Sequence, residues 1–450
     1  MNNSIKLSGA IAFLMLAAGA VSAQKTDFKF EFGSGKVKSG YTAVTPATVY
    51  TKDLGYGFDF GSTVQAVDRS GKDPMKASLI TSDKPFFFSV DVPEGNYKVT
   101  VTLGDAKEPT ITTVKAESRR LMLEKVETKA GEFVTKTFVV YIRKPEISTG
   151  GKVSLKPREL TKLDWDNKLT LEFNNSHPAV SALQIEKVED QITVYLAGNS
   201  TVVDQDDEPW ASWGQMIPRF FKPGVAIANQ AESGLTLGSF KGSHRLDKVL
   251  STAKPGDYLF IEFGHNDQKD KGPNDGAWKS YTENFEYYIA QAKAKGMIPV
   301  IVTSTSRRAF SDTTGKVYNT LGDFPAAARK VAQDEDVAMI DVNAMTADFY
   351  NALGKDKSTK AFVHYPANTW PGQGAKPLAD NTHFNVYGAY EIAKMIVEGI
   401  RLNHLGLEKF LVDMPHFDPL HPDDVDTFSL PVTPPSPTLK AAAFVKPDGN

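Results

Sequence analysis

The hydrophobic pattern changes once along the chain, near Gln191, and this change constrains the fold more than any other feature. Before it, short segments alternate between apolar and polar residues, with turn residues such as Pro93-Glu94-Gly95-Asn96 between them. Spaced short strands of this kind are typical of an all-β sandwich. The expected strands cover residues 28–32, 86–92, 97–103, 133–142, 169–173 and 182–188. We therefore expect a β-sandwich domain over residues 24–190.

After Gln191, continuous apolar runs alternate with helical stretches. The expected strands are 192–197, 225–229, 258–263, 298–303 and 337–342, and the expected helices are 211–221, 245–253, 282–295, 323–334 and 386–403. Apolar strands separated by helices predict a parallel sheet covered on both faces. Such a sheet carries its functional site at the carboxyl ends of its strands. We expect an α/β domain over residues 191–413, followed by a Pro- and Asp-rich tail over 414–450 that either packs along the surface or is loosely ordered.

The first residues have the features of a secretory signal peptide. Lys6 precedes an apolar stretch over residues 10–20, and Val21-Ser22-Ala23 is typical of a cleavage site. The apolar stretch is too short to span a membrane. The chain has no cysteine, which excludes disulfides, thiolate metal sites, a cysteine nucleophile and a lipid anchor at this cleavage site. We expect residues 1–23 to be removed and the protein to be secreted or periplasmic in a bacterium.

The charge of the chain argues against two classes of partner. The formal net charge is −3, so nothing indicates binding to nucleic acid or to an anionic membrane. An acidic cluster (Asp204, Asp206, Asp207 and Glu208) lacks the glycine and the distal glutamate of a calcium-binding EF-hand loop. We interpret this cluster as a hydrated loop near the site entrance, and we expect no metal site. The sequence leaves the oligomeric state open.

Polar residues follow several of the predicted strands and can meet at one edge of the sheet. They are Gly198-Asn199-Ser200, the segment Asn229 to Gly234, Gly264-His265-Asn266-Asp267, and Asp380-Asn381-Thr382-His383 just before the last helix. Taken alone, Ser200 can be a nucleophile, a turn serine or part of a glycosylation sequon with Asn199 and Thr201. Similarly, Asp380 and His383 can simply begin a helix, where an acidic side chain favours the positive end of the dipole.

Together these residues provide what ester hydrolysis requires. A nucleophile, a base, a group that orients the base and donors for the oxyanion are needed. Ser200 can be the nucleophile, His383 the base and Asp380 the orienting acid. Backbone N–H groups near Ser200 and Gly234, and the side-chain amide of Asn266, can bind the oxyanion. This chemistry needs no cofactor.

The same residues resemble the motif blocks of the SGNH (GDSL-type) hydrolase family, in the family order over the α/β half. The blocks correspond to Gly198-Asn199-Ser200, to Gly234, to Gly264-His265-Asn266-Asp267 and to Asp380-x-x-His383. The stretches AGNSTV, EFGHND and DNTHFN most resemble rhamnogalacturonan acetylesterases. The resemblance implies a flavodoxin-like three-layer α/β fold, Ser-His-Asp acyl transfer and an acetylated plant cell-wall polysaccharide as substrate. The N-terminal half resembles galactose-binding-like sandwiches, which can bind carbohydrate.

The chain departs from the family pattern at Asn199, where the family has an acid. Asparagine retains hydrogen-bonding capacity without charge, so we expect catalysis to survive. We name His265 and Trp210 as candidate substrate-binding residues, although either can instead pack in the interior. We assign Trp213 to the core and expect Asp267 to hold the loop that presents Asn266.

Two other functions remain open from the sequence. The substrate can be another acetylated polysaccharide such as xylan, or the chain can be a non-catalytic carbohydrate-binding protein. The second alternative is suggested by Asn199 and by the N-terminal sandwich.

Overall fold

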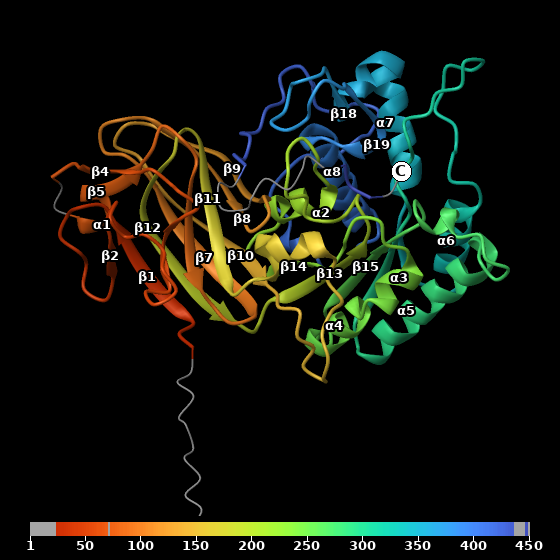
Figure 1. Cartoon of the computed structure of the whole chain (residues 1–450), viewed down its shortest axis with the longest axis horizontal. Coiled ribbons are helices and arrows are strands. Elements are labelled where there is room, and N and C mark those ends of the chain that lie inside the picture. The colour runs from red at the N-terminus through yellow and green to blue at the C-terminus, as the bar shows by residue number, and fades with distance from the viewer. Residues whose placement is uncertain (1–23, 71–72, 436–445, 449–450) are drawn as a thin grey trace, which may run out of the picture.

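The computed structural model describes residues 24–70, 73–435 and 446–448. A β-sandwich and an α/β domain lie side by side (Figure 1). Both fold classes expected from the sequence are confirmed, in the expected order along the chain. The predicted signal peptide, residues 1–23, lies outside the described residues. None of the described helices is both long enough and apolar enough to cross a membrane.

The N-terminal domain consists of two sheets packed face to face. One has the strand order β10-β7-β12-β1-β2, with β5 and β4 attached through β12, and the other has the order β3-β6-β11-β8-β9. The strands of the first sheet are β1 (Asp27–Phe32), β2 (Thr42–Val44), β4 (Gln65–Asp68), β5 (Ser78–Thr81), β7 (Gly95–Gly104), β10 (Phe133–Ile142) and β12 (Ala179–Val188). Those of the second are β3 (Tyr56–Asp59), β6 (Phe86–Asp91), β8 (Thr110–Ala116), β9 (Arg120–Thr128) and β11 (Lys168–His177). A short helix, α1 (Pro74–Ala77), precedes β5.

Aromatic side chains from both sheets fill the space between them. The ring of Phe88 lies 5.1–5.5 Å from those of Phe30, Phe32 and Phe58. All four are at most 2% exposed. Because alternate residues of a strand face opposite sides, the alternating sequence pattern places these residues on the inner faces.

The second domain is built on a parallel sheet with the order β14-β13-β15-β16-β17. This is the 2-1-3-4-5 order of the flavodoxin-like fold, which places a ligand site where the strand order reverses. The reversal lies between β13 and β15, and the polar segments containing Ser200 and Asn266 directly follow these two strands. The strands are β13 (Ile192–Gly198), β14 (Val225–Asn229), β15 (Tyr258–Glu262), β16 (Ile298–Val302) and β17 (Ala338–Ile340).

Helices cover both faces of this sheet, as the apolar strands predict. Along β13, Val194 and Leu196 enter one hydrophobic cluster, while Tyr195 and Ala197 enter the other. The first cluster includes residues of α2 (Trp213–Met216), α7 (Val342–Lys357) and α8 (Val386–Leu402). The second includes residues of α3 (Leu237–Gly242), α4 (Arg245–Thr252), α5 (Thr282–Ala294) and α6 (Phe324–Asp334).

Several elements of the second domain differ from the sequence-based expectation. The helix expected over 211–221 is only α2 followed by a 3₁₀ turn, Ile217–Phe220, because Pro218 has no N–H with which to continue the α-helical ladder. The strand expected over 337–342 is shorter, and Asp341 caps the unpredicted α7 by accepting a hydrogen bond from the Ala344 N–H. An unpredicted hairpin of β18 (Phe362–Tyr365) and β19 (Leu378–Phe384) lies outside the main sheet.

The two domains share buried side chains. Tyr141 of β10 packs against Tyr195 of β13, with ring centroids 6.1 Å apart, in one hydrophobic cluster. Leu121 of β9 belongs to the cluster that contains α2 and α8. The segment between β10 and β11 also crosses to the second domain, where the buried Glu159 pairs with Arg245. The sandwich is therefore packed firmly onto the α/β domain.

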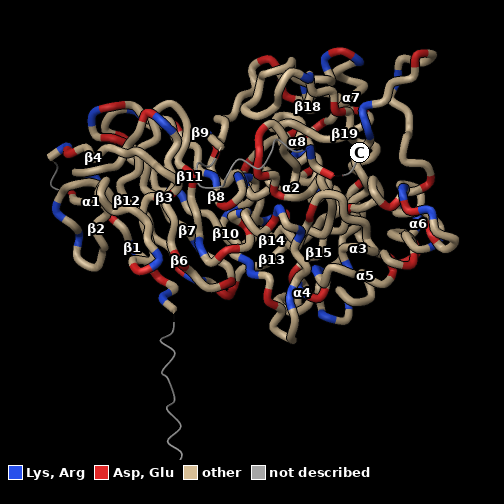
Figure 2. The backbone as a smooth tube through the Cα atoms, viewed as in Figure 1, with Lys and Arg blue, Asp and Glu red and all other residues tan. Residues whose placement is uncertain are grey.

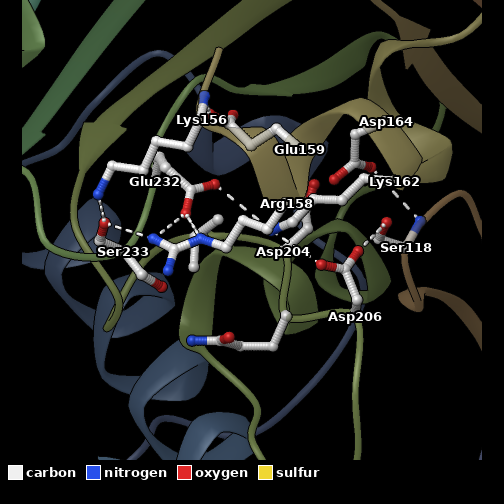
Figure 3. Close-up of polar contacts among 12 residues, drawn as sticks. Ser118, Lys156, Arg158, Glu159, Lys162, Asp164, Asp204, Asp206, Glu232 and Ser233 are labelled. Carbon is white, nitrogen blue, oxygen red and sulfur yellow. Dashed lines mark hydrogen bonds and ion pairs between the residues drawn. The ribbon is translucent and has the colours of Figure 1, made fainter. Parts of the chain in front are cut away.

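The interpretation of the acidic cluster as a hydrated loop is wrong. Three of its four carboxylates pair with cations from the sandwich half, and Asp204 is completely buried. Figure 3 shows Asp204, Asp206 and Lys162 in this interface. The pairs are Arg120–Asp204 (2.7 Å), Lys162–Asp206 (2.8 Å) and Arg119–Glu208 (2.6 Å). Their partners come from a distant part of the chain, which a local pattern cannot reveal. Within the described ranges, no group of three or more His, Asp or Glu residues is placed to hold a metal ion.

Of the two states expected for the C-terminal tail, its described part adopts the first and packs along the surface. Lys115 Nζ donates to the carbonyl of Pro431, and the side-chain amide of Asn174 donates to that of Val432. After the tail's undescribed stretch, Lys446 Nζ lies 3.2 Å from Asp380 Oδ2 of the second domain. The tail thus contacts both domains.

Candidate active site

Ser200 lies in the turn that follows β13. The carbonyl of Asn199 accepts hydrogen bonds from the N–H groups of Val202 and Val203, which close the turn. A Cβ on Gly198 would lie 2.5 Å from a methyl group of Val202, so only glycine fits at the end of the strand. The tight turn places the hydroxyl of Ser200 at the carboxyl edge of the sheet, and Ser200 is 3% exposed.

His383 and Asp380 complete a hydrogen-bonded series with Ser200. The Nε2 atom of His383 lies 2.9 Å from Ser200 Oγ, and its Nδ1 atom lies 2.8 Å from Asp380 Oδ2. The other oxygen of Asp380 accepts from the N–H groups of Thr382 and His383, at 2.8 and 3.0 Å. This is the arrangement of a nucleophile, a base and an orienting acid.

The environment of Asp380 keeps it ionised. Burial alone would raise the pKa of Asp380, but hydrogen bonds and charge from His383 outweigh it and hold the pKa well below its usual range. A carboxylate at Nδ1 keeps the hydrogen there and leaves Nε2 free to accept the proton of Ser200. The two residues lie on β19 and not at a helix terminus, because α8 begins later and is capped by Asn385.

The predicted oxyanion residues come from the loops after β14 and β15. Gly234 has φ +79°, a conformation that favours glycine. The amide of Asn266 donates to the carbonyl of Leu235 at 3.1 Å, and its oxygen accepts from Lys269 at 3.2 Å. These two contacts fix the amide plane and leave its second N–H hydrogen for a ligand.

Asp267 has the structural role expected from the sequence. Its two oxygens accept from the N–H groups of Leu237 and Gly264, each at 2.9 Å. These bonds join the loop after β14 to the loop after β15. Asp267 therefore fixes the loop of Asn266 relative to that of Gly234.

Asn199 supports the turn that carries Ser200 without adding charge. It is fully buried, and its Oδ1 accepts from the N–H and the hydroxyl of Thr201, at 3.2 and 3.0 Å. The Thr201 hydroxyl also lies 2.8 Å from an oxygen of Glu262, whose pKa burial raises to about 7. An acid at position 199 would place a second carboxyl in this buried network. Asparagine therefore makes the contacts of the turn while avoiding repulsion from Glu262.

The titration of Glu262 predicts how stability depends on pH. Its pKa is about 7 in the folded chain and 4.5 for an unperturbed side chain, so the folded state binds more protons between these values and loses stability as pH rises through them. In Glu262→Gln, the Thr201 hydroxyl can donate to Asn199 and accept from the new amide. We expect the unfolding free energy of the variant, relative to wild type, to increase by roughly 3 kcal/mol from about pH 4.5 to pH 7.

Urea unfolding at several pH values measures this difference. The control is Glu286→Gln, which changes an exposed side chain on α5. If the difference in unfolding free energy between Glu262→Gln and wild type does not change with pH, Glu262 is ionised in the folded chain over the whole pH range measured.

The two candidate substrate-binding residues are buried. Trp210 is 2% exposed, so the interpretation that its ring stacks on a sugar is wrong, since no face of the indole is available. His265 is also 2% exposed, and burial with the charges of Arg307 and His383 lowers its pKa well below the usual value. His265 is therefore a neutral ring in the interior and offers almost no surface to a sugar. The assignment of Trp213 to the core is confirmed, with 1% exposure.

Sequence reasoning missed two cations close to Gly234. Lys156 Nζ lies 3.1 Å from the position that a Cβ on Gly234 would take. Arg158 donates to the carbonyl of Ser233 at 2.9 Å and pairs with Glu232. Both belong to the segment between β10 and β11 in the sandwich half, which carries no periodic pattern. No sequence signal could therefore have placed them beside a loop of the other domain.

Comparison with known proteins agrees with this architecture. The family model "GDSL-like Lipase/Acylhydrolase family" matches residues 195–389, and the model "Beta-agarase/YXIM esterase-like, galactose-binding domain-like" matches residues 28–143. The rhamnogalacturonan acetylesterase RhgT of Bacillus subtilis (strain 168) is 39% identical over 223 residues, which cover 49% of this chain and 94% of that protein. The uncharacterized esterase YxiM of the same strain is 26% identical over 408 residues, covering 87% of this chain and 96% of YxiM.

A crystal structure of YxiM from Bacillus subtilis aligns with 24% identity and a TM-score of 0.44, covering 84% of this chain and 99% of that one. The sequence identity to RhgT extends over nearly the whole of that esterase. The chain therefore belongs to the GDSL-like lipase/acylhydrolase family, a family of carboxylic-ester hydrolases, and carries a galactose-binding-like domain before its hydrolase domain.

Proposed function

We propose that the chain is an esterase that removes acetyl groups from a pectic polysaccharide, the rhamnogalacturonan backbone. The observation that carries this proposal is the series Ser200–His383–Asp380, with contacts of 2.9 and 2.8 Å at the carboxyl edge of the sheet. Support for the substrate comes from RhgT, which is named as a rhamnogalacturonan acetylesterase and aligns over 94% of its length.

The proposed reaction has two acyl-transfer steps. His383 Nε2 takes the proton of Ser200 as its oxygen attacks the acetyl carbonyl, and Asp380 stabilises the imidazolium that forms. His383 then gives the proton to the sugar oxygen as its bond to the acetyl carbon breaks, so the sugar leaves with a free hydroxyl and acetate stays esterified to Ser200. His383 takes a proton from water as the water oxygen attacks this ester, and returns that proton to Ser200 Oγ as acetate leaves. No cofactor takes part.

The oxyanion of each tetrahedral intermediate needs hydrogen-bond donors that are already in place. We assign this role to the backbone N–H groups of Ser200 and Gly234 and to the side-chain amide of Asn266. The hydrogen bonds of Asp267 and Lys269 support this assignment, because they fix the two loops before substrate binds. Such preorganised donors contribute about 3–4 kcal/mol each in related chemistry.

The location of such a substrate implies export. We propose that residues 1–23 direct the chain out of the cytoplasm, as their sequence pattern suggests, so that it can meet plant cell-wall polysaccharide. Neither nucleic acid nor a membrane is part of this proposal.

Acetate release from purified substrates tests the proposed function. We expect kcat/KM for acetylated rhamnogalacturonan to exceed that for acetylated xylan by about tenfold or more. This factor corresponds to a difference of about 1.4 kcal/mol in transition-state binding between the two substrates. Acetate is measured enzymatically, and methanol release is followed in parallel to detect methyl-ester hydrolysis.

The other outcomes contradict the proposal in different ways. Faster deacetylation of xylan would change the substrate and keep the chemistry. Faster hydrolysis of long-chain 4-nitrophenyl esters than of the acetyl ester would indicate a lipase. Pectin binding without any ester hydrolysis would indicate a non-catalytic carbohydrate-binding protein.

A further inference from the structure

The segment between β10 and β11 brings two cations of the sandwich half to the loop that contains Gly234. Lys156 Nζ donates to the carbonyl of Ser233 at 2.6 Å, and Arg158 Nη2 donates to the same oxygen at 2.9 Å. Figure 3 shows both side chains extending toward Ser233 and Glu232. Both cations thus lie beside the proposed oxyanion glycine.

These cations are held in place by buried contacts. Glu232, which is 1% exposed, pairs with Arg158 at 2.6 Å and with Lys162 at 3.4 Å. Glu159, in the same segment as Lys156, accepts from the N–H of Lys156 at 2.8 Å and pairs with the buried Arg245. The geometry is therefore set before a ligand arrives, which lowers the entropic cost of binding.

A carboxylate of the chain itself occupies the space between the two cations. Asp448 Oδ2 lies 2.8 Å from Arg158 Nη1 and 3.3 Å from Lys156 Nζ, and 3.4 Å from the position that a Cβ on Gly234 would take. Two residues earlier, Lys446 Nζ lies 3.2 Å from Asp380. The chain end therefore extends from the orienting acid of the site to its proposed oxyanion loop.

The local charge differs from that of the whole chain. Figure 2 shows acidic and basic residues mixed over the molecule, whose formal net charge is −3. Burial and the charge of Arg307 lower the pKa of Lys269, while the charge of Asp448 opposes them, so Lys269 also feels the carboxylate that the two cations hold. A ligand carboxylate in the place of Asp448 would therefore be attracted by Lys156, Arg158 and Lys269.

We propose that Lys156 and Arg158 form a subsite for the carboxylate of a uronic acid in the substrate, next to the acetyl group that is removed. This inference rests on the proposed function and deepens it: the sandwich half supplies part of the substrate specificity. The Asp448 carboxylate occupies the subsite in the free chain, and a uronate carboxylate replaces it during binding. RhgT aligns over nearly its whole length with only half of this chain, so these two residues are a feature of the longer architecture.

The first measurement compares two forms of one substrate. Acetylated rhamnogalacturonan oligosaccharides are prepared with their uronate carboxylates either free or methyl-esterified. In Lys156→Gln, we expect the ratio of kcat/KM for the free form to that for the esterified form to fall about tenfold, as expected for one charge-assisted hydrogen bond at a partly exposed site. Lys129→Gln, an equal charge change in the exposed turn between β9 and β10, is expected to keep the wild-type ratio.

Lys156 is the better residue to replace. Arg158 also neutralises the buried Glu232, so its loss would destabilise the fold as well as the subsite. An unchanged ratio in Lys156→Gln overturns the proposal, since the residue would then act on the ester group or the fold alone. Absence of acetate release from the free form by the wild-type chain would instead refute the proposed function itself.

The second measurement does not depend on the polysaccharide. Galacturonate is expected to inhibit hydrolysis of 4-nitrophenyl acetate more strongly than galactose, and Lys156→Gln is expected to need about tenfold more galacturonate for the same inhibition. Asp448→Asn removes the internal carboxylate, so this variant is expected to need less galacturonate than wild type for the same inhibition. Equal inhibition of the wild-type chain by galacturonate and galactose overturns the proposal. Equal inhibition of wild type, Lys156→Gln and Asp448→Asn by galacturonate overturns it as well.

Discussion

Replacing Ser200 with alanine is expected to lower kcat for acetate release by about 10⁴- to 10⁶-fold, the range observed when a nucleophile of this kind is removed. The hydroxyl of Ser200 is the group next to His383 Nε2, at 2.9 Å. Without it no acyl-enzyme can form, and only activity from oxyanion stabilisation and substrate positioning remains. Initial rates of acetate release from acetylated rhamnogalacturonan measure the effect.

Two controls separate a chemical loss from misfolding. Ser200→Ala removes one oxygen from a turn that is held by backbone bonds and by Asn199, so its melting temperature should stay close to that of wild type. Ser176→Ala changes an exposed serine of β11 and should retain full activity. A Ser200→Ala rate within tenfold of wild type would refute the assignment of the nucleophile.

Replacing Asp380, the acid in the series Ser200–His383–Asp380, gives a second measurement of kcat to compare with wild type. Asp380→Asn keeps the size of the side chain but cannot hold a hydrogen on Nδ1 in the same way, so kcat should fall about 10⁴-fold. If Asp380 only positioned β19, kcat of Asp380→Asn would fall far less. This graded comparison distinguishes an electrostatic role of Asp380 from a structural one.

The residues of the site were predictable where the sequence places them directly after strands. Ser200 and Asn266 follow apolar runs, and the parallel sheet brings such ends together. The hairpin strand that carries Asp380 and His383 was not predicted, because its polar side chains replace the apolar pattern of a strand. Local rules are expected to fail where residues serve chemistry.

The errors have a common physical cause. Trp210 is a candidate to stack on a sugar in the sequence, yet it is buried, and the carbonyl of Trp210 accepts a hydrogen bond from Arg119 of the sandwich. The helix α7 was missed because β17 is only three residues long and the apolar pattern continues from it into the helix. Contacts between domains and very short strands leave little trace in a local pattern.

The close association of the domains changes what the sandwich can be. Residues 24–190 would, as an isolated fragment, expose Tyr141, Leu121 and the cations that now pair with the second domain. Two of the residues nearest to the Gly234 loop come from that half. The sandwich is thus a structural part of the site region, and its role in substrate binding is open to direct test through Lys156.

Replacing Arg120 with methionine is expected to reduce the unfolding free energy by about 3–5 kcal/mol, the cost of breaking a buried ion pair from one side. The guanidinium lies 2.7 Å from Asp204, 3.0 Å from Asp164 and 2.8 Å from the carbonyl of Tyr141, with its side chain 2% exposed. Burial opposes the charge of Arg120, but Asp204 and Asp164 outweigh it and raise the pKa of the guanidinium. Its removal leaves both carboxylates buried with fewer partners.

Urea unfolding followed by tryptophan fluorescence measures this loss, and a second variant identifies its cause. In Arg120→Met/Asp204→Asn one of the two carboxylates is replaced by a neutral amide, which can still accept the hydrogen bond that Asn229 donates at 2.9 Å, and Asp164 keeps its pair with Arg143 at 3.2 Å. The double variant should therefore be more stable than the single one. Lys98→Met breaks an exposed pair with Glu186 and should change stability by no more than about 1 kcal/mol. If Arg120→Met costs no more than Lys98→Met, the interface does not depend on buried charge, and the shared hydrophobic clusters alone hold the domains together.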